Sequence, residues 1–508
     1  MIPLLALLLA GTAFATDAVT DGRKLYAANR LEEARRIFAG AVRSAPGNTT
    51  ARMWLAFTQL ALGELEPALM NMERLETVCA HDSEYLFAYS EASTRRARQL
   101  SEAVAALGDS SARAHQLLAY RYKARGEWRI AVKELRRAAE LRPRLAGVHL
   151  DAAEILWEQQ QFEEAGAELE AELRVHPSGF LANLRYGQLL LRRRSPDAVP
   201  PLETAARYHR YPEAHVLLGL AWEQRGDPER AAAVLSGGLA LFPGNSDLLE
   251  ARSRLWSRFP EVKNASGVWS PAPLRETAPD SPALRRALAR NPRDEDALFL
   301  LSQRCADTGE KFFQRLEQEA PDSHRVWQMR GLQAESAGDL RLAETCYRRV
   351  LEKQPELAGA HFELGLILQK LGDTESSNAE YRAELRIDPN HYLAAYELGS
   401  SLARNGDTRA GLPWLERAVH NGSSFVEAKV ELARAYISLG QFRSALPLLR
   451  DAVSKAPQHP SAHFLLHRCY RALGETAEAQ AQLAVHERIL RNGQPTQSGM
   501  SGPQGPSH

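Results

Sequence analysis

The chain has 508 residues, of which 44% are apolar, and its 63 Lys and Arg balance its 63 Asp and Glu. This apolar content is sufficient for a continuous hydrophobic core. The balanced charge excludes a global electrostatic attraction to nucleic acid or to anionic membranes, so we expect no nucleic-acid partner.

An apolar leader opens the chain at residues 1–15 (MIPLLALLLAGTAFA). Its core runs from Leu4 to Ala10, and Ala13 and Ala15 supply the small-x-small pattern that precedes a signal-peptide cut. The leader is too short to span a bilayer, so we predict a removable signal peptide and a periplasmic or extracellular protein. No Lys or Arg precedes the apolar core, and the alternative of an apolar leader on a cytosolic protein stays open. No later stretch is apolar enough to predict an integral membrane segment.

Small and apolar residues recur about every 34 residues from residue 17 onwards. Small residues at three repeat positions let paired helices approach closely, a glycine permits the turn between them, and a proline ends the second helix. The pattern therefore predicts consecutive antiparallel helical hairpins. It is clearest in 324–357, with Trp327, Gly331, Gly338, Ala343, Tyr347 and Pro355, and in 358–391, with Gly365, Gly372, Tyr381 and Pro389.

This spacing resembles that of the tetratricopeptide repeat (TPR) family, and the resemblance covers nearly all of the chain after the leader. It implies an all-α fold, an α-solenoid superhelix of about 13–14 TPR-like helical hairpins in which no hairpin is stable alone. It also implies an inner groove, lined by the first helix of each hairpin, that binds an extended peptide or a partner's helix. The family is linked to no single reaction or cofactor, and we expect no cofactor.

The repeats are interrupted once, at residues 260–280, which are rich in Pro, Ser and Ala. We therefore predict an N-terminal array over 17–259 and a C-terminal array over 281–490, the second beginning near a short repeat at 293–322. The interruption is either a loop insertion within one repeat or a linker between two solenoids. Residues 491–508 lack an apolar stripe and are predicted to be a disordered tail.

The positions that line the groove in this fold hold aromatic and basic residues in the C-terminal array. Because Arg can hold a carboxylate through two parallel hydrogen bonds, they suit other proteins as partners, through an acidic peptide or helix. The alternative is that the arginines pair with local glutamates, Glu363, Glu397 and Glu431. The predicted groove residues are Phe362, Lys370, Tyr396, Arg404, Arg434, Phe464, Arg468 and Arg471.

No GxSxG, P-loop, HExxH or Gly-rich dinucleotide motif is present, so we predict that the protein is not an enzyme. The preferred hypothesis is a non-catalytic scaffold or adaptor that mediates protein–protein interaction outside the cytoplasm. One alternative is a glycan- or cell-wall-associated binding protein, with Trp157, Trp222 and Trp414 as stacking surfaces. Another is a regulatory subunit of an envelope enzyme.

The last hairpin contains His463, His467 and His486, of which the last two replace the usual Gly and Ala. Facing imidazoles could bind a transition metal, but relaxed packing in a terminal repeat also accounts for them, and we expect no metal. Cys305 and Cys346 lie in neighbouring predicted repeats, which leaves open whether they pair or remain free thiols.

Overall fold

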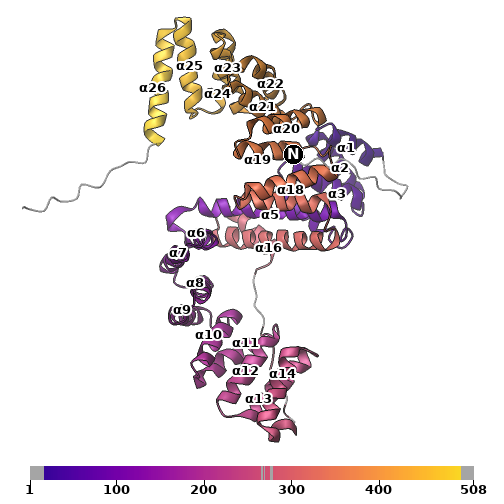
Figure 1. The fold of residues 1–508 in the computed structure, drawn as a ribbon, viewed down its shortest axis with the longest axis vertical. Helices are drawn as coiled ribbons and strands as arrows, with labels where there is room; N and C mark the ends of the chain where they lie inside the picture. The colour runs from indigo at the N-terminus through magenta and orange to yellow at the C-terminus, as the bar shows by residue number, and fades with distance from the viewer. Residues whose placement is uncertain (1–16, 265–266, 268, 270, 275–278, 494–508) are drawn as a thin grey trace, which may run out of the picture. The chain divides into compact units, whose positions relative to one another are not determined.

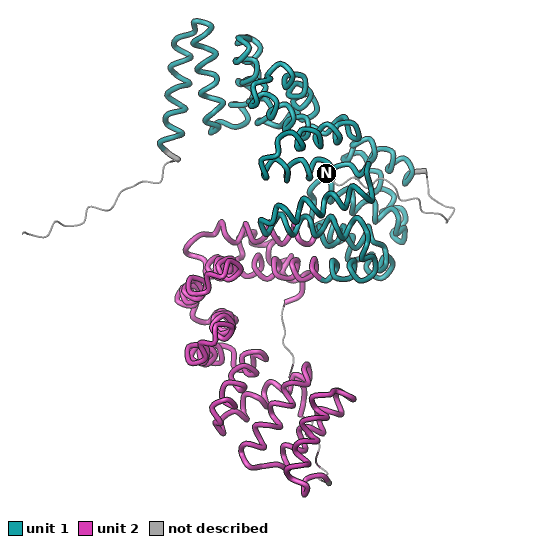
Figure 2. The backbone as a smooth tube through the Cα atoms, viewed as in Figure 1, with its two compact units in different colours: residues 1–92, 311–508 teal, residues 93–310 magenta. Residues whose placement is uncertain are grey.

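The computed structural model describes residues 17–264, 267, 269, 271–274 and 279–493. Within these residues the chain forms 26 α-helices and no strand (Figure 1), which confirms the predicted all-α fold. The predicted signal peptide, residues 1–15, and residues 494–508 of the predicted tail lie outside the described residues. The chain divides into two compact units (Figure 2).

The first unit comprises residues 1–92 and 311–508. Its helices are α1 (Asp17–Ala27), α2 (Leu31–Ser44), α3 (Thr49–Ala61), α4 (Leu65–Glu73), the N-terminal part of α5 (Ser83–Ala105), the C-terminal part of α16 (Glu295–Glu319), α17 (His324–Ser336), α18 (Leu340–Lys353), α19 (Ala360–Lys370), α20 (Thr374–Ile387), α21 (Tyr392–Arg404), α22 (Thr408–Asn421), α23 (Val426–Ser438), α24 (Phe442–Lys455), α25 (Pro460–Leu473) and α26 (Thr476–Gly493).

The second unit comprises residues 93–310. Besides the remaining parts of α5 and α16, its helices are α6 (Ala112–Ala124), α7 (Trp128–Leu141), α8 (Val148–Glu158), α9 (Phe162–Val175), α10 (Phe180–Arg192), α11 (Val199–Ala206), α12 (Pro212–Gln224), α13 (Pro228–Leu241), α14 (Ser246–Arg258) and α15 (Ser281–Arg290).

Most helices form hairpins with their neighbour in the chain, as the repeat predicts. Gly338 and Gly372 connect the helices of two hairpins with φ of +81° and +86°, a backbone conformation that glycine adopts without strain. A Cβ atom on Gly365 would lie 2.5 Å from Cε1 of Tyr381, so glycine is what allows α19 to approach α20. Within the described residues, eleven hairpins pack in this way: α1–α2, α3–α4, α6–α7, α8–α9, α10–α11, α12–α13, α17–α18, α19–α20, α21–α22, α23–α24 and α25–α26.

Two long helices depart from the hairpin pattern. The expected short repeat at 293–322 is wrong: this segment contains α16, a single 25-residue helix. In the first unit α16 packs against α5, which lies more than 200 residues earlier in the sequence. The Phe312 ring lies 4.2 Å from the Tyr89 ring and 6.0 Å from the Tyr85 ring, centroid to centroid. Helix α16 therefore takes its partner from a distant segment, because a repeat unit stacks on whichever apolar face completes its core.

A buried ion pair reinforces this long-range packing. Arg325, at the start of α17, is 2% exposed and donates from Nε and Nη2 to the Glu84 carboxylate of α5, at 2.9 and 2.6 Å. Its guanidinium also lies 4.7 Å from the centroid of the Phe87 ring. A buried charge is tolerated only where its hydrogen bonds are satisfied, so the pair fixes how α17 meets α5.

In the second unit, the first turn of α16 is held by the α6–α7 hairpin. Arg142 contacts Glu295 at 2.6 Å and Asp296 at 2.8 Å, and Arg113 contacts Asp296 at 2.7 Å. The Arg113 guanidinium also stacks 4.6 Å from the Phe299 ring centroid. The second unit is thus closed by contacts between its first hairpin and its last helix.

The described part of the inserted loop packs against the second unit. Trp269 N donates to Ala233 O at 3.0 Å, and Leu274 N donates to Arg207 O at 2.9 Å. A Cβ atom on Gly237 would lie 2.1 Å from Trp269 O, so α13 accepts the loop only because glycine stands there. The compact units divide within α5 and α16 and not at 260–280, so they do not coincide with the expected arrays 17–259 and 281–490.

Filling the contact at Gly365 should destabilise the first unit. Replacing Gly365 with Leu places side-chain atoms where the Tyr381 ring lies, and we expect a loss of about 1–3 kcal/mol in the free energy of unfolding. The matched control is Gly40→Leu in α2, where a Cβ atom would meet nothing within 4 Å. Urea titration measures both variants. Equal urea midpoints for the two variants would show that the close approach of α19 to α20 does not determine the stability of the first unit.

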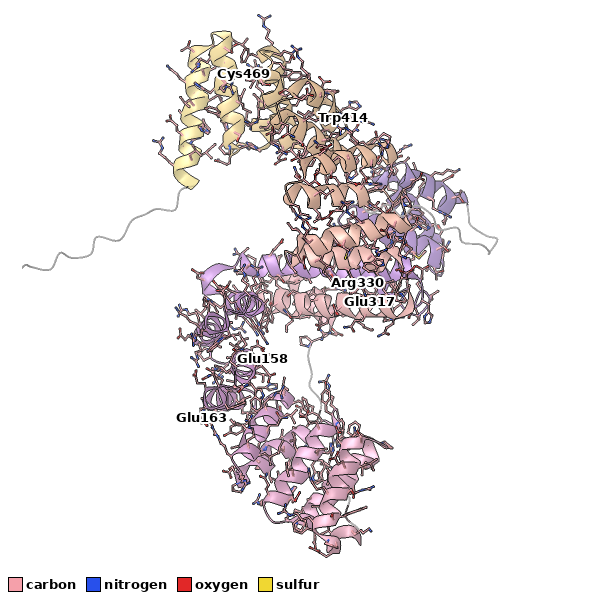
Figure 3. All side chains as sticks on the ribbon, in the orientation of Figure 1. Glu158, Glu163, Glu317, Arg330, Trp414 and Cys469 are labelled. Atoms are coloured by element: carbon pink, nitrogen blue, oxygen red, sulfur yellow. The ribbon has the colours of Figure 1, made fainter. Side chains whose placement is uncertain are left out.

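Breaking the buried pair should loosen the first unit at its long-range contact. Arg325→Met removes the bidentate partner of the largely buried Glu84 carboxylate, and we expect a cost of about 3–5 kcal/mol. Arg330→Met is the control, because Arg330 and Glu317 pair at 2.7 Å in a partly exposed position (Figure 3) and should contribute less than about 1 kcal/mol. Urea titration with hydrogen exchange over residues 17–80 checks both. Similar losses in the two variants would contradict the assignment.

Candidate functional site

Four of the predicted groove residues are exposed arginines on the first helices of the last three hairpins. Arg434 donates to Glu431 at 3.2 Å, whereas Arg404, Arg468 and Arg471 make no ion pair with a described residue. Phe464 is 41% exposed and shares one face of α25 with Arg468 and Arg471, since these residues are three and four positions apart. We call Arg404, Arg434, Phe464, Arg468 and Arg471 the arginine face.

The other three predicted groove residues are either buried, half-buried or already bonded within the chain. Phe362 is 9% exposed and packs against His391, with ring centroids 4.7 Å apart, so it belongs to the core. Tyr396 is half-buried and packs edge-on against Phe425 at 5.0 Å. Lys370 is exposed but donates to Glu335 at 2.6 Å. The structure therefore does not gather all eight predicted residues into one accessible set.

The three histidines of the last hairpin bond to protein oxygens. Both ring nitrogens of His463 lie within hydrogen-bond distance of such atoms, at 2.6 and 3.1 Å. His467 and His486 each donate from Nδ1 to a backbone carbonyl, at 2.9 and 3.0 Å. In the part of the chain that the structure describes, no group of three or more His, Cys, Asp or Glu is arranged to hold a metal ion.

The cysteines and tryptophans have structural surroundings. Cys305 and Cys346 are both buried, and no disulfide joins them. Trp222 is 5% exposed in the core of the second unit, and Trp157 packs edge-on against Phe162 at 5.3 Å. Trp414 (Figure 3) is half-buried against the core between α19 and α23. These tryptophans contribute to packing and not to an open stacking surface.

A pocket of about 600 Å³ lies in the second unit between α8, α10 and the start of α12. The Phe180 and Tyr211 rings stack there, 5.2 Å apart, and Tyr211 is 49% exposed. Arg185, which also lines the pocket, pairs with Glu154 at 2.8 Å. This surface is aromatic, and the charge of Arg185 is compensated by Glu154.

A second pocket, of about 820 Å³, lies in the first unit between the α1–α2 turn, the α18–α19 loop and the end of α20. Glu384, fully buried in its wall, accepts from the backbone N–H groups of Gly359 and Phe362 at 2.7 and 3.3 Å. Burial lowers the pKa of His391 to about 4, so this imidazole is neutral. Sequence reasoning missed the pocket, because its walls come from segments more than 300 residues apart.

Two consecutive hairpins of the first unit differ in one polar network. In the later hairpin, Tyr381 Oη donates to Gln369 Oε1 at 3.0 Å, and Gln369 Nε2 donates to Glu397 at 3.1 Å. The equivalent residues 34 positions earlier are Tyr347, Glu335 and Glu363. A comparison of equivalent repeat positions would have found this exchange of Gln for Glu, which sequence reasoning missed.

Family models described as tetratricopeptide repeat match the chain in several segments. One model matches residues 25–70 and 437–493. A second model matches 150–198, 192–246, 329–391 and 362–424. Together these segments take in more than half of the chain. A comparison with curated proteins found no match.

Solved structures of tetratricopeptide repeat proteins resemble parts of the chain. The MamA protein is 20% identical over 34% of this chain and 94% of its own, with a TM-score of 0.32. MamA from Desulfovibrio magneticus RS-1, residues 41 to the end, is 19% identical over 34% of this chain and 97% of its own, with a TM-score of 0.32. YrrB, described as a TPR protein with an unusual peptide-binding site, is 19% identical over 36% of this chain and 93% of its own, with a TM-score of 0.33.

The glycine turns, the hairpins and the family matches agree with one another. No helix among the described residues is long and apolar enough to cross a membrane. The chain belongs to the tetratricopeptide repeat family.

Proposed function

We propose that this protein is a non-catalytic scaffold that binds an acidic extended peptide or helix of a partner protein at its arginine face, outside the cytoplasm. The tetratricopeptide repeat fold is a scaffold for protein–protein interaction. The observation that carries the proposal is the lack of an acidic partner for Arg404, Arg468 and Arg471 among the described residues. Arg468 and Arg471 share one face of α25 with the exposed ring of Phe464.

The electrostatics of the arginine face allow its ion pair within the chain to be replaced by ion pairs with a partner's carboxylates. Arg434 and Arg468 occupy the same position in consecutive hairpins, so a single bound segment can meet both. The one intramolecular pair, Arg434 with Glu431, is partly exposed and contributes at most about 1 kcal/mol. A bidentate hydrogen bond from each arginine to a carboxylate would replace it without leaving a buried charge.

The two alternative functions have less support. A glycan-binding surface needs exposed aromatic rings, and Trp157, Trp222 and Trp414 are packed into the helical cores. A regulatory subunit of an envelope enzyme would also use a protein-binding face, so it differs from the proposal only in the identity of the partner. We therefore propose the scaffold function, with a protein partner that carries carboxylates.

Charge reversal on the arginine face should abolish partner binding. We expect Arg434→Glu/Arg468→Glu to lose its partner in affinity purification from the envelope fraction, because each change removes a cation and adds a repulsive carboxylate. The matched control is Arg409→Glu/Arg443→Glu, with the same charge change at exposed sites on the second helices α22 and α24. Retention of the same protein by both double variants would rule out this face.

Export should remove the leader at a defined position. We expect the mature protein in the extracytoplasmic fraction to begin at Thr16, because the small residues Ala13 and Ala15 form the peptidase recognition pattern. N-terminal sequencing of the purified mature protein measures this, and Ala13→Arg/Ala15→Arg should block the cut. A mature protein in the cytoplasm that retains residues 1–15 would contradict the proposed location.

A further inference from the structure

Two equivalent positions in consecutive hairpins carry different chemistry. In the hairpin α19–α20, the amide of Gln369 both accepts from Tyr381 and donates to Glu397, so every polar group of the network has a partner. One repeat earlier, in α17–α18, the position of Gln369 is held by Glu335. A carboxylate has no N–H group, so Glu335 cannot donate to Glu363 as Gln369 donates to Glu397.

The exchange leaves polar groups without partners. Tyr347, the equivalent of Tyr381, is 1% exposed, and its Oη atom has no hydrogen-bond partner. The Glu363 carboxylate makes no hydrogen bond or ion pair with a described residue, although the backbone N–H of Glu363 donates to Gly359 O at 3.0 Å. Burying a polar group without a hydrogen bond is costly, so the position lacks a group that can donate N–H bonds.

Among the described residues, two acidic groups and one basic group act on Glu363. Glu335 on α17 and Glu91 on α5 are acidic, and Lys370 on α19 is basic and bonded to Glu335 at 2.6 Å. Burial, together with Glu335 and Glu91, raises the pKa of Glu363 to about 7 despite Lys370. Lys370 is bonded to Glu335 and not to Glu363, so the Glu363 carboxylate has no bonded cation among the described residues and could accommodate one more cation.

The geometry favours an organic cation over a metal ion. No group of three or more His, Cys, Asp or Glu is arranged to hold a metal among the residues that the structure describes. An ammonium or guanidinium group, in contrast, carries several N–H donors and can reach acceptors that are further apart. Such a group would donate to Glu363 and to Tyr347 Oη, the acceptors of this cluster that have no bonded partner among the described residues.

We infer that Glu335, Glu363 and Tyr347 form a recognition site for one basic side chain, Lys or Arg, of the segment that the scaffold binds. This inference rests on the proposed function in so far as the basic residue belongs to a bound partner segment. The site lies in the same compact unit as the arginine face. A segment with a basic residue near α17–α19 and acidic residues near α21–α25 would bind in only one direction, because reversal would bring like charges together.

The test uses the full-length protein and two defined peptides. One is a nine-residue Gly/Ser peptide with a single central lysine, and the other has norleucine, an uncharged analogue, in place of lysine. Binding is followed at pH 8 by the carbon-13 chemical shifts of the glutamate carboxyl groups. We expect a saturable shift of Glu363 with the lysine peptide only, and weaker binding as the pH falls through about 7, because Glu363 takes up a proton.

Two variants make the test specific. Glu335→Gln reproduces the network of the next hairpin, so Glu363 should gain a hydrogen bond, its pKa should fall and lysine binding should weaken by about tenfold or more. Gln369→Glu is the reciprocal change and should create a second lysine-binding site beside Glu397. Both variants keep the size of the side chain, and thermal unfolding verifies that they fold.

Several outcomes would overturn the inference. Equal binding of the lysine and norleucine peptides would show that charge is not recognised. Unchanged lysine binding in Glu335→Gln, or no binding by the wild type, would assign the two carboxylates a structural role only. Arg434→Glu/Arg468→Glu should retain the lysine response, so loss of the envelope partner in that variant and failure of the lysine site are separate results.

Discussion

The packing of α16 and α17 against α5 is the constraint on which the rest of the structure depends. A helical hairpin of this kind has an apolar face that its own two helices cannot cover, so it needs a neighbour on each side. The first hairpins obtain theirs from a segment more than 200 residues later, through the contacts of the Phe312 ring with Tyr85 and Tyr89 and through the pair of Arg325 with Glu84. The chain therefore leaves the first unit within α5 and re-enters it within α16, and residues 93–310 form the second unit between these two points. Loop closure on this scale costs little more than closure of a short loop, because the entropy grows only with the logarithm of length.

The local elements could be predicted from the sequence, and the long-range contacts could not. The turns at Gly338 and Gly372 depend on a single φ angle, and the approach of α19 to α20 depends on the missing Cβ of Gly365, so the repeat pattern contains that information. The pattern also predicts that each hairpin stacks on the next one in the chain. Nothing in a 34-residue period indicates that α16 would pack on a distant helix, because any apolar face of the right width could serve.

The candidate site shows the same division between local and distant information. Arg434 and Arg468 are exposed, as their repeat position predicts, because that position faces away from the paired helix. Phe362 is buried against His391, and no residue near it in sequence signals this, since His391 comes from the next hairpin. The exchange of Gln369 for Glu335 is visible in the sequence, but its consequence depends on the surrounding carboxylates, including Glu91 from the distant helix α5.

Consecutive hairpins of the first unit differ in their polar and charged residues, although the total charge of the chain is balanced. Glycine and tyrosine recur at the packing positions of consecutive hairpins because these positions maintain the stack, so they cannot distinguish one hairpin from the next. The polar positions between them are free to differ. Where the network is closed, as at Tyr381 and Gln369, the hairpin is satisfied without a ligand. Where the network is open, as at Tyr347, the unsatisfied hydroxyl lowers the stability of the free protein. A ligand that forms a hydrogen bond with this hydroxyl would restore the lost stability. Specificity in such an array therefore comes from the hairpins that depart from the repeat, and stability comes from those that follow it.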